Sequence, residues 1–377
     1  MAPEVTVTIY TAPPEALVTL LAQSHMLYGL PLLHRLQFTK FPGGITEHTR
    51  ILWASEISLE DHHLAATATT AAATTNGIVN GSGGSGSVNM GARTETPFAA
   101  AYLDLSRGPE TELWIYSSME RRVGSSVSAG ATEANGVGIE LGGEVEDGEK
   151  KEGEEIAAIE TACAIALLRA VRREQDIYFV PGSRRSLARA FPTILVGALN
   201  EVLRENLAAA GMAIVSTGLY DKWVFRVAEL PADDEVPLPT PLEDGRCWVW
   251  DKVRKGDIPF MISRTEIHRT ERTMKLLPST ALYLDDGTPV AWAFLGPDSS
   301  LSSLHCEEPY RGKGIAKAVA VKLLKDHLKD YSDDGYGWAD VAPDNLGSRR
   351  VCQSLNGRVE WQISWSRLNL NESFPNE

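Results

Sequence analysis

The sequence predicts an α/β (α+β) fold built from two units, and three observations support this prediction. Short apolar runs with strand-like alternation are interleaved along the chain with segments of helical periodicity. A proline- and acid-rich stretch at 230–243 divides the 377 residues into two parts of ordinary domain size. Later in the chain, an extended run enters a basic, glycine-containing turn and then an amphipathic helix. We predict an N-terminal domain at 1–230, a linker at 231–245 and a C-terminal domain at 246–371.

Composition narrows the classes of function. The net charge of −14 argues against a general nucleic-acid-binding protein. No apolar run approaches the roughly 20 residues of a membrane-spanning helix, and the N-terminus lacks a basic region followed by an apolar core. The four cysteines form no CxxC or Cys/His cluster, which indicates free thiols and no metal site. We expect a cytoplasmic protein without nucleic-acid or membrane partners, with a nuclear location left open.

The first unit alternates strands and helices around two insertions. Alternating or continuous apolar runs predict strands at 4–10, 48–57, 98–105, 112–117, 212–217 and 223–227, the last two joined by a turn around Asp221. Helical spacing of apolar residues predicts helices at 13–27, 156–173 and 190–209. Gly/Ser/Asn-rich or acidic composition predicts flexible insertions at about 65–95 and 124–155.

The second unit has a clearer order of elements. A strand begins at Trp248, and a helix is predicted at 263–277. An Asp286-Gly287 turn predicts a hairpin of strands 281–284 and 289–295. The remaining elements are predicted as a strand at 301–306, a helix at 315–328, a strand at 337–341, a helix at 345–355 and a strand at 359–365.

The turn at 309–314 has the features of a phosphate-binding loop. Gly312 and Gly314 have no Cβ, so the backbone there can approach a bulky polyphosphate. The first amides of the following helix lack intrahelical partners and carry the positive end of the helix dipole. Arg311 and Lys313 add positive charge beside them. The segment is locally basic although the protein is acidic, which suits a polyanionic ligand.

These residues resemble the GNAT acyltransferases. Residues 311–316, RGKGIA, match the (Q/R)xxGx(G/A) signature of that superfamily, and the order of elements from 248 to 370 is the GNAT order. Residues 290–293 (VAWA) and 309–312 (PYRG) further resemble the glycine N-acyltransferase group, whose N-terminal unit is a degenerate GNAT-like half. The resemblance implies tandem GNAT-like domains, each with a mixed, mostly antiparallel twisted sheet flanked by helices.

The resemblance also implies a site for acyl-coenzyme A as co-substrate. Backbone amides of the loop and helix would hold the pyrophosphate, one strand would pair with the pantetheine arm, and an asparagine would meet the coenzyme from the other side. The residues at these positions are Arg311, Gly312, Lys313, Gly314, Ile315, Ala316 and Lys317 in the loop, Leu304, His305 and Cys306 on the strand, and Asn345.

The catalytic residues are less clear. The family's glycine N-acyltransferases have a glutamate where this chain has Ser300, so we favour His305 as general base and then Glu307, with Asp298 and Glu308 nearby. In many GNAT enzymes a tyrosine protonates the leaving thiolate. Its place here is taken by Cys352, which is either an acid or a small buried apolar residue.

The implied function is an N-acyltransferase that moves an acetyl or short acyl group from coenzyme A to an amine of a small molecule. Arg264 or Arg269 is a candidate for binding an acceptor carboxylate, unless they simply belong to an exposed helix face. Because the usual glutamate and tyrosine are both missing, the alternative is a catalytically silent acyl-CoA-binding or interaction module.

Overall fold

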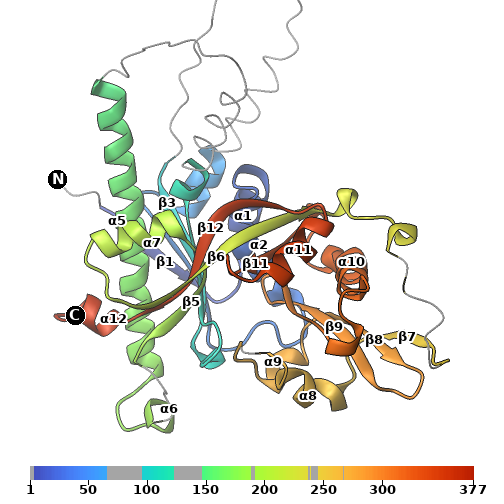
Figure 1. Ribbon diagram of the computed structural model, residues 1–377. Coiled ribbons are helices and arrows are strands. Elements are labelled where there is room, and N and C mark those ends of the chain that lie inside the picture. The colour runs from blue at the N-terminus through green and yellow to red at the C-terminus, as the bar shows by residue number, and fades with distance from the viewer. Residues whose placement is uncertain are drawn as a thin grey trace, which may run out of the picture.

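The computed structural model describes residues 4–65, 96–122, 147–187, 192–236, 238, 245–265 and 267–377. In these residues the chain forms an eight-stranded sheet of order β1-β2-β3-β4-β5-β12-β6-β11 and a four-stranded sheet of order β10-β9-β8-β7. Figure 1 shows the larger sheet running through the molecule and the smaller one beside it, next to α10. The first predicted insertion, and residues 124–146 of the second, lie outside the described residues.

Strands and helices alternate along the chain. The strands are β1 (Thr6–Tyr10), β2 (Thr49–Ser55), β3 (Phe98–Asp104), β4 (Leu113–Ser117), β5 (Ile194–Asn200), β6 (Ile214–Arg226), β7 (Trp248–Asp251), β8 (Ser279–Leu284), β9 (Pro289–Leu295), β10 (Leu301–Cys306), β11 (Tyr336–Val341) and β12 (Arg358–Leu368). The helices are α1 (Glu15–Ser24), α2 (Leu30–Gln37), α5 (Asp147–Tyr178), α6 (Arg184–Leu187), α7 (Glu201–Ala209), α8 (Ile258–Ile262), α9 (Glu271–Met274), α10 (Ile315–His327), α11 (Leu346–Ser354) and α12 (Leu370–Ser373), with further helical segments at 59–65 and 118–122.

The N-terminal half of the large sheet is covered on both faces. Along β2, Leu52 and Ala54 pack into a core with residues of α5 and α7. Their neighbours Ile51 and Trp53 pack into a second core with residues of α1 and α2. Because successive side chains of a strand point to opposite faces, this division places α5 and α7 on one face and α1 and α2 on the other.

The last strand of the chain joins the two halves. β12 pairs antiparallel with β5 on one side and with β6 on the other, so a C-terminal strand fills the middle of the N-terminal sheet. β6 in turn pairs with β11, so an N-terminal strand extends the C-terminal unit. In Figure 1, β6 in yellow and β12 in red lie side by side and cross from one half to the other. The domain limits at 231–245 stay a prediction, and the sheet is continuous across them.

A buried ion pair lies at this junction. Lys222 on β6 is 0% exposed, and its Nζ lies 2.5 Å from Oδ1 of Asp340 on β11. The indole of Trp365 on β12 donates to the other oxygen of Asp340 at 3.3 Å. Burial raises the pKa of Asp340, and the lysine opposes that shift. Strands β6, β11 and β12 therefore each contribute one side chain to this cluster.

Two predicted elements of the first unit are wrong. Residues 194–200 form strand β5 and not the first half of a helix, which begins only at Glu201. A strand buried on both faces is apolar without alternation, so Leu195 and Leu199 also fit a helical spacing. The predicted turn around Asp221 is absent as well, because β6 runs unbroken through it and Asp221 pairs with Arg349.

Two further boundaries differ from the predictions. The predicted helix at 263–277 is reduced to the short α9, preceded by the short α8, with no helix at 263–265 or 267–270. Helix α5 starts at Asp147, so residues 147–155 are helical although their acidic composition suggested part of an insertion. Burial of the apolar side chains of α5 against β2 and β3 stabilises this helix more than local propensity does.

Candidate functional site

Strands β10 and β11 meet at one point and belong to different sheets beyond it. Their contact is a single parallel bridge between Ser300 and Trp338. β10 is the edge strand of the small sheet, and its register shifts between Ser302 and His305, where Ser303 has a left-handed φ of 51°. A distorted edge strand beside a diverging parallel neighbour offers backbone groups to an extended ligand.

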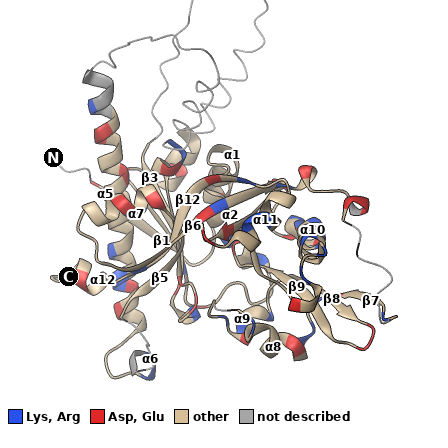
Figure 2. Ribbon diagram, in the orientation of Figure 1, with Lys and Arg blue, Asp and Glu red and all other residues tan. Residues whose placement is uncertain are grey.

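The glycine turn follows β10 and opens helix α10. Gly312 and Gly314 have φ values of 75° and 80°, a conformation that disfavours any side chain. Gly314 is the N-cap of α10, and no side chain among the described residues caps it. A Cβ at either glycine would meet nothing within 4 Å, so the backbone faces open space. Figure 2 shows basic residues along α10, so an uncapped helix start and positive charge coincide here.

Arg311 turns back toward the strand. Its Nε donates a hydrogen bond of 2.9 Å to the carbonyl oxygen of Cys306. This contact fixes the course of the turn between β10 and α10. Arg311 is exposed, so the remaining N–H groups of its guanidinium can still donate to an anion.

His305 belongs to a small cluster at the end of β10. Its ring stacks on Trp292 with centroids 4.6 Å apart, and its Nε2 lies 3.3 Å from Oε1 of Glu307. Arg264 donates to the same carboxylate oxygen at 3.0 Å. Burial lowers the pKa of His305, with Arg311 and Arg264 lowering it further and Glu307 raising it. The imidazole is therefore neutral at pH 7, the form that accepts a proton.

The two cysteines and the asparagine have structural surroundings. Cys352 is 3% exposed within the apolar core of the second unit, and burial raises the pKa of its thiol to about 12. Burial likewise raises the pKa of Cys306 to about 11. Asn345 caps α11, its Oδ1 accepting from the amide of Ser348 at 3.0 Å. Both thiols are thus protonated at neutral pH.

A pocket lies where the two halves of the chain meet. Its lining includes Arg35, Glu110 and Trp114 from the N-terminal half and Arg269, Asp298 and Ser300 from the C-terminal half. Asp298 is 1% exposed and accepts from the amide and hydroxyl of Ser300, at 3.2 and 2.7 Å. Because Ser300 also bridges to β11, the pocket reaches the point where β10 and β11 diverge.

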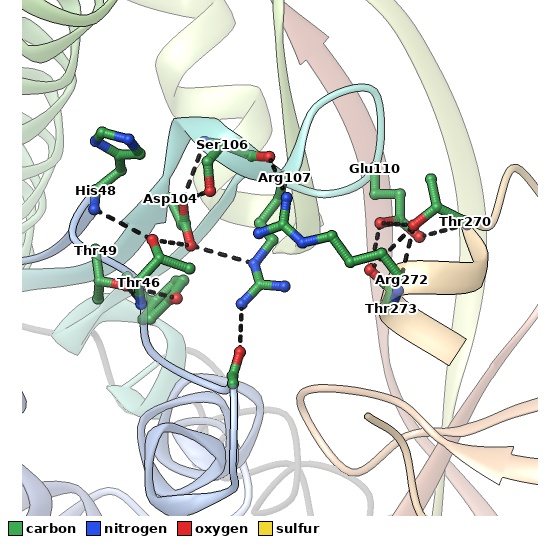
Figure 3. Close-up of polar contacts among 12 residues, drawn as sticks. Thr46, His48, Thr49, Asp104, Ser106, Arg107, Glu110, Thr270, Arg272 and Thr273 are labelled. Carbon is green, nitrogen blue, oxygen red and sulfur yellow. Dashed lines mark hydrogen bonds and ion pairs between the residues drawn. The ribbon is translucent and has the colours of Figure 1, made fainter. Parts of the chain in front are cut away.

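Hydrogen bonds between the β3–β4 turn and α9 form one wall of this pocket. Glu110 accepts bonds from the amide of Thr270 at 3.0 Å and from its hydroxyl at 3.1 Å, and also from the hydroxyl of Thr273. Figure 3 shows Glu110 lying against both threonines, with Arg107 turned toward Asp104. The N-terminal half therefore helps to shape a site on the C-terminal half.

The structure groups some of the predicted site residues and separates others. His305 contacts Glu307, Arg311 bonds to Cys306, and both pairs lie at the end of β10. Cys352 and Asn345 belong to α11, and no described contact joins them to His305. Among the described residues no group of three or more His, Cys, Asp or Glu side chains is placed to hold a metal ion. Nor is any described helix long and apolar enough to cross a membrane.

The contribution of the first unit to this pocket was not predicted from the sequence. Arg35 and Glu110 line the pocket from segments more than 150 residues away from Asp298 in the sequence. No motif surrounds either residue. The local signal was an arginine within the mostly apolar helix LPLLHRLQ.

Comparison with known families identifies the class that this fold and site define. Residues 248–357 match the model of the acetyltransferase (GNAT) family, and residues 4–228 match the acyl-CoA N-acyltransferase verG N-terminal domain. The protein is thus a tandem GNAT-fold member of the acyl-CoA N-acyltransferase superfamily. More particularly, the chain belongs to the family defined by the verG-type N-terminal domain. A search of curated protein sequences found no match.

Several solved structures are similar to this chain. A Drosophila protein aligns over 94% of this chain and 95% of its own, with 10% identity and a TM-score of 0.50. A tandem GNAT protein from the clavulanic acid biosynthesis pathway aligns over 97% and 98%, with 10% identity and a TM-score of 0.46. A GNAT-family acetyltransferase from Novosphingobium aromaticivorans covers 42% of this chain and 67% of its own, with 17% identity and a TM-score of 0.31. At 10% identity, the similarity to the Drosophila protein concerns the fold alone.

Proposed function

We propose that this protein transfers an acetyl or other short acyl group from coenzyme A to an amine of a small molecule. The observation that supports it most is the turn at 312–314, where two left-handed glycines open an uncapped helix directly after an edge strand. Helix amides there would hold the pyrophosphate, and the edge of β10 would pair with the pantetheine arm. The acyl carbonyl would then lie near Ser300, where β10 and β11 diverge.

In the proposed reaction, the neutral amine nitrogen attacks the thioester carbonyl carbon. The new C–N bond forms, the C–S bond breaks, and coenzyme A leaves as a thiolate that takes up a proton. The amine is cationic in water, so a base must first remove a proton. Neutral His305 is our first candidate and Glu307 the second, with buried Asp298 a third on the pocket side.

Cys352 is the proposed proton donor to the thiolate. Its raised pKa, about 12, keeps it protonated at neutral pH but makes it a weaker acid than the thiol that it would form. Its place in the apolar core also suits the alternative, a buried structural residue. Because Cys352 is a weak acid in the apolar core, a second candidate function is an acyl-CoA-binding module without catalytic activity.

Binding and turnover separate the two candidates. We expect calorimetric titration with acetyl-CoA to show a single site with micromolar affinity, about −8 kcal/mol, and a panel of small amines to give thiol release. Binding without release across the panel would favour the silent module. Absence of heat at millimolar acetyl-CoA would remove both.

The pH dependence of turnover tests the role of His305. In the wild type, kcat/KM should fall as pH drops below about 6.5, because protonation removes the base and the lowered pKa places the limb on the acid side. His305→Ala should lower kcat by about 100-fold and flatten that limb. Since folding lowers this pKa, the stability linked to His305 is present above about pH 6.5 and is lost as pH falls through the folded-state value.

His327→Ala is the matched control, because this half-buried histidine lies at the far end of α10 beside Asp330. It should leave the profile unchanged. An unaltered profile in His305→Ala would instead assign the base to Glu307, Asp298 or water.

We further infer that acyl-CoA and the amine acceptor are its partners, without nucleic acid or membrane, and that it works in the cytoplasm. The four cysteines are free thiols, which suits a reducing compartment.

A further inference from the structure

The guanidinium of Arg35 is buried beside the pocket, where burial lowers its pKa and the nearby carboxylates of Asp104 and Asp298 oppose that shift. Arg35 lies on α2 and is 2% exposed, and its Nε and Nη1 atoms are buried without a hydrogen-bond partner. Among the described residues no carboxylate forms an ion pair with it. Its Cζ lies 3.5 Å from the ring centre of Tyr102 and 5.1 Å from that of Trp114, so aromatic faces hold the cation in place.

The other buried arginine of the pocket shows what a structural role looks like. Arg107 donates to the Asp104 carboxylate at 3.2 Å and to the carbonyl of Gly43 at 2.9 Å. Its charge is therefore neutralised within the chain. Arg35 has no such arrangement, although a buried cation that lacks a partner lowers stability. Such a loss of stability is typical of a residue that binds a ligand.

Acidic groups share the same pocket. Asp298 is held by Ser300 and by the indole of Trp114, which donates to its Oδ2 at 3.2 Å. Trp114 therefore contacts the carboxylate directly and lies close to Arg35. Glu110 supplies a second acid on the wall. A molecule that fits here would place an anionic group toward Arg35 and an ammonium group toward Asp298.

We propose that Arg35 binds the carboxylate of the acceptor, so that the acceptor is an amino acid or a similar amine that also carries a carboxylate. This inference rests on the proposed function, since the amine of that molecule is the group acylated. The carboxylate lies toward the N-terminal half, and the amine lies toward Ser300 and the divergence of β10 and β11. The N-terminal half thereby supplies the specificity-determining residue for chemistry on the C-terminal half.

The test compares acceptors that differ only in this group. Thiol release from acetyl-CoA is measured with the standard amino acids and with their carboxamides. The wild type should prefer the carboxylate form of its best acceptor by about 10- to 100-fold in kcat/KM, as for a hydrogen-bonded charge pair. The preference cannot come from amine protonation, because the carboxamides have the less basic, more available amine. Arg35→Met should reduce it to within about threefold, mainly through KM, and Arg35→Lys should retain part of it.

Two controls make the result decisive. Arg50→Met removes an arginine that already pairs with Glu174 outside the pocket, and it should keep the full preference. The melting temperature of Arg35→Met should stay within about 4 °C of the wild type, because no internal ion pair is broken. Equal rates for acids and amides in the wild type, or an unchanged preference in Arg35→Met, would overturn the inference while the acyltransferase function stands. Failure to bind acetyl-CoA would overturn both.

Discussion

Gly314→Glu is expected to lower the affinity for acetyl-CoA by more than 100-fold while the protein stays folded. Gly314 has a φ of 80° at the N-cap of α10, and open space surrounds the position of a Cβ. A glutamate there would place a carboxylate where the helix amides would hold the pyrophosphate, so both charge repulsion and the strained backbone oppose binding. Calorimetric titration with acetyl-CoA measures the loss.

Gly211→Glu is the matched control for this substitution. Gly211 also has a left-handed φ, 87°, and open space around its Cβ position, but it follows α7 in the N-terminal half. Its variant should bear the same conformational cost and bind acetyl-CoA as the wild type does. Equal affinities of the two variants would show that the turn at 312–314 does not bind the coenzyme.

Separate expression of the two halves, 1–236 and 245–377, is expected to yield no folded protein from either. The first fragment lacks β12, which lies between β5 and β6, and the second lacks β6, which lies between β11 and β12. Backbone hydrogen bonds contribute about 1 kcal/mol each and buried aliphatic side chains such as Ile363 about 1.5–3 kcal/mol. Losing a central strand therefore removes about as much as a domain's whole stability of roughly 5–15 kcal/mol.

A chain cut at a protease site inserted at 239–244 is the control. It retains every strand of both sheets, so it should stay folded and melt as one unit. Mixing the two separate fragments should restore part of that signal. A cooperative melt of either isolated fragment, followed by circular dichroism, would contradict the expected interdependence.

The coenzyme half of the site could be predicted from the sequence because it depends on a short contiguous segment. Glycines at 312 and 314, the basic residues beside them and the helix that follows are local in the chain, and their geometry follows from backbone conformation. The hairpin of β8 and β9 was predictable for the same reason, since its Asp-Gly turn is a local signal. The helix predicted over β5 failed because burial on both faces removes the alternation that marks a strand.

The sequence by itself thus determined the class of fold, the position of the glycine turn and the locally basic helix that follows it. Tertiary structure alone decided that β12 enters the N-terminal sheet and that Arg35 comes to lie in one pocket with Asp298. The physical reason is that strand exchange and burial depend on contacts between residues far apart in the chain, which no local periodicity encodes. An arginine in a mostly apolar helix is only an irregularity in the sequence until the fold places it, buried and not ion-paired with any described carboxylate, in the lining of a pocket.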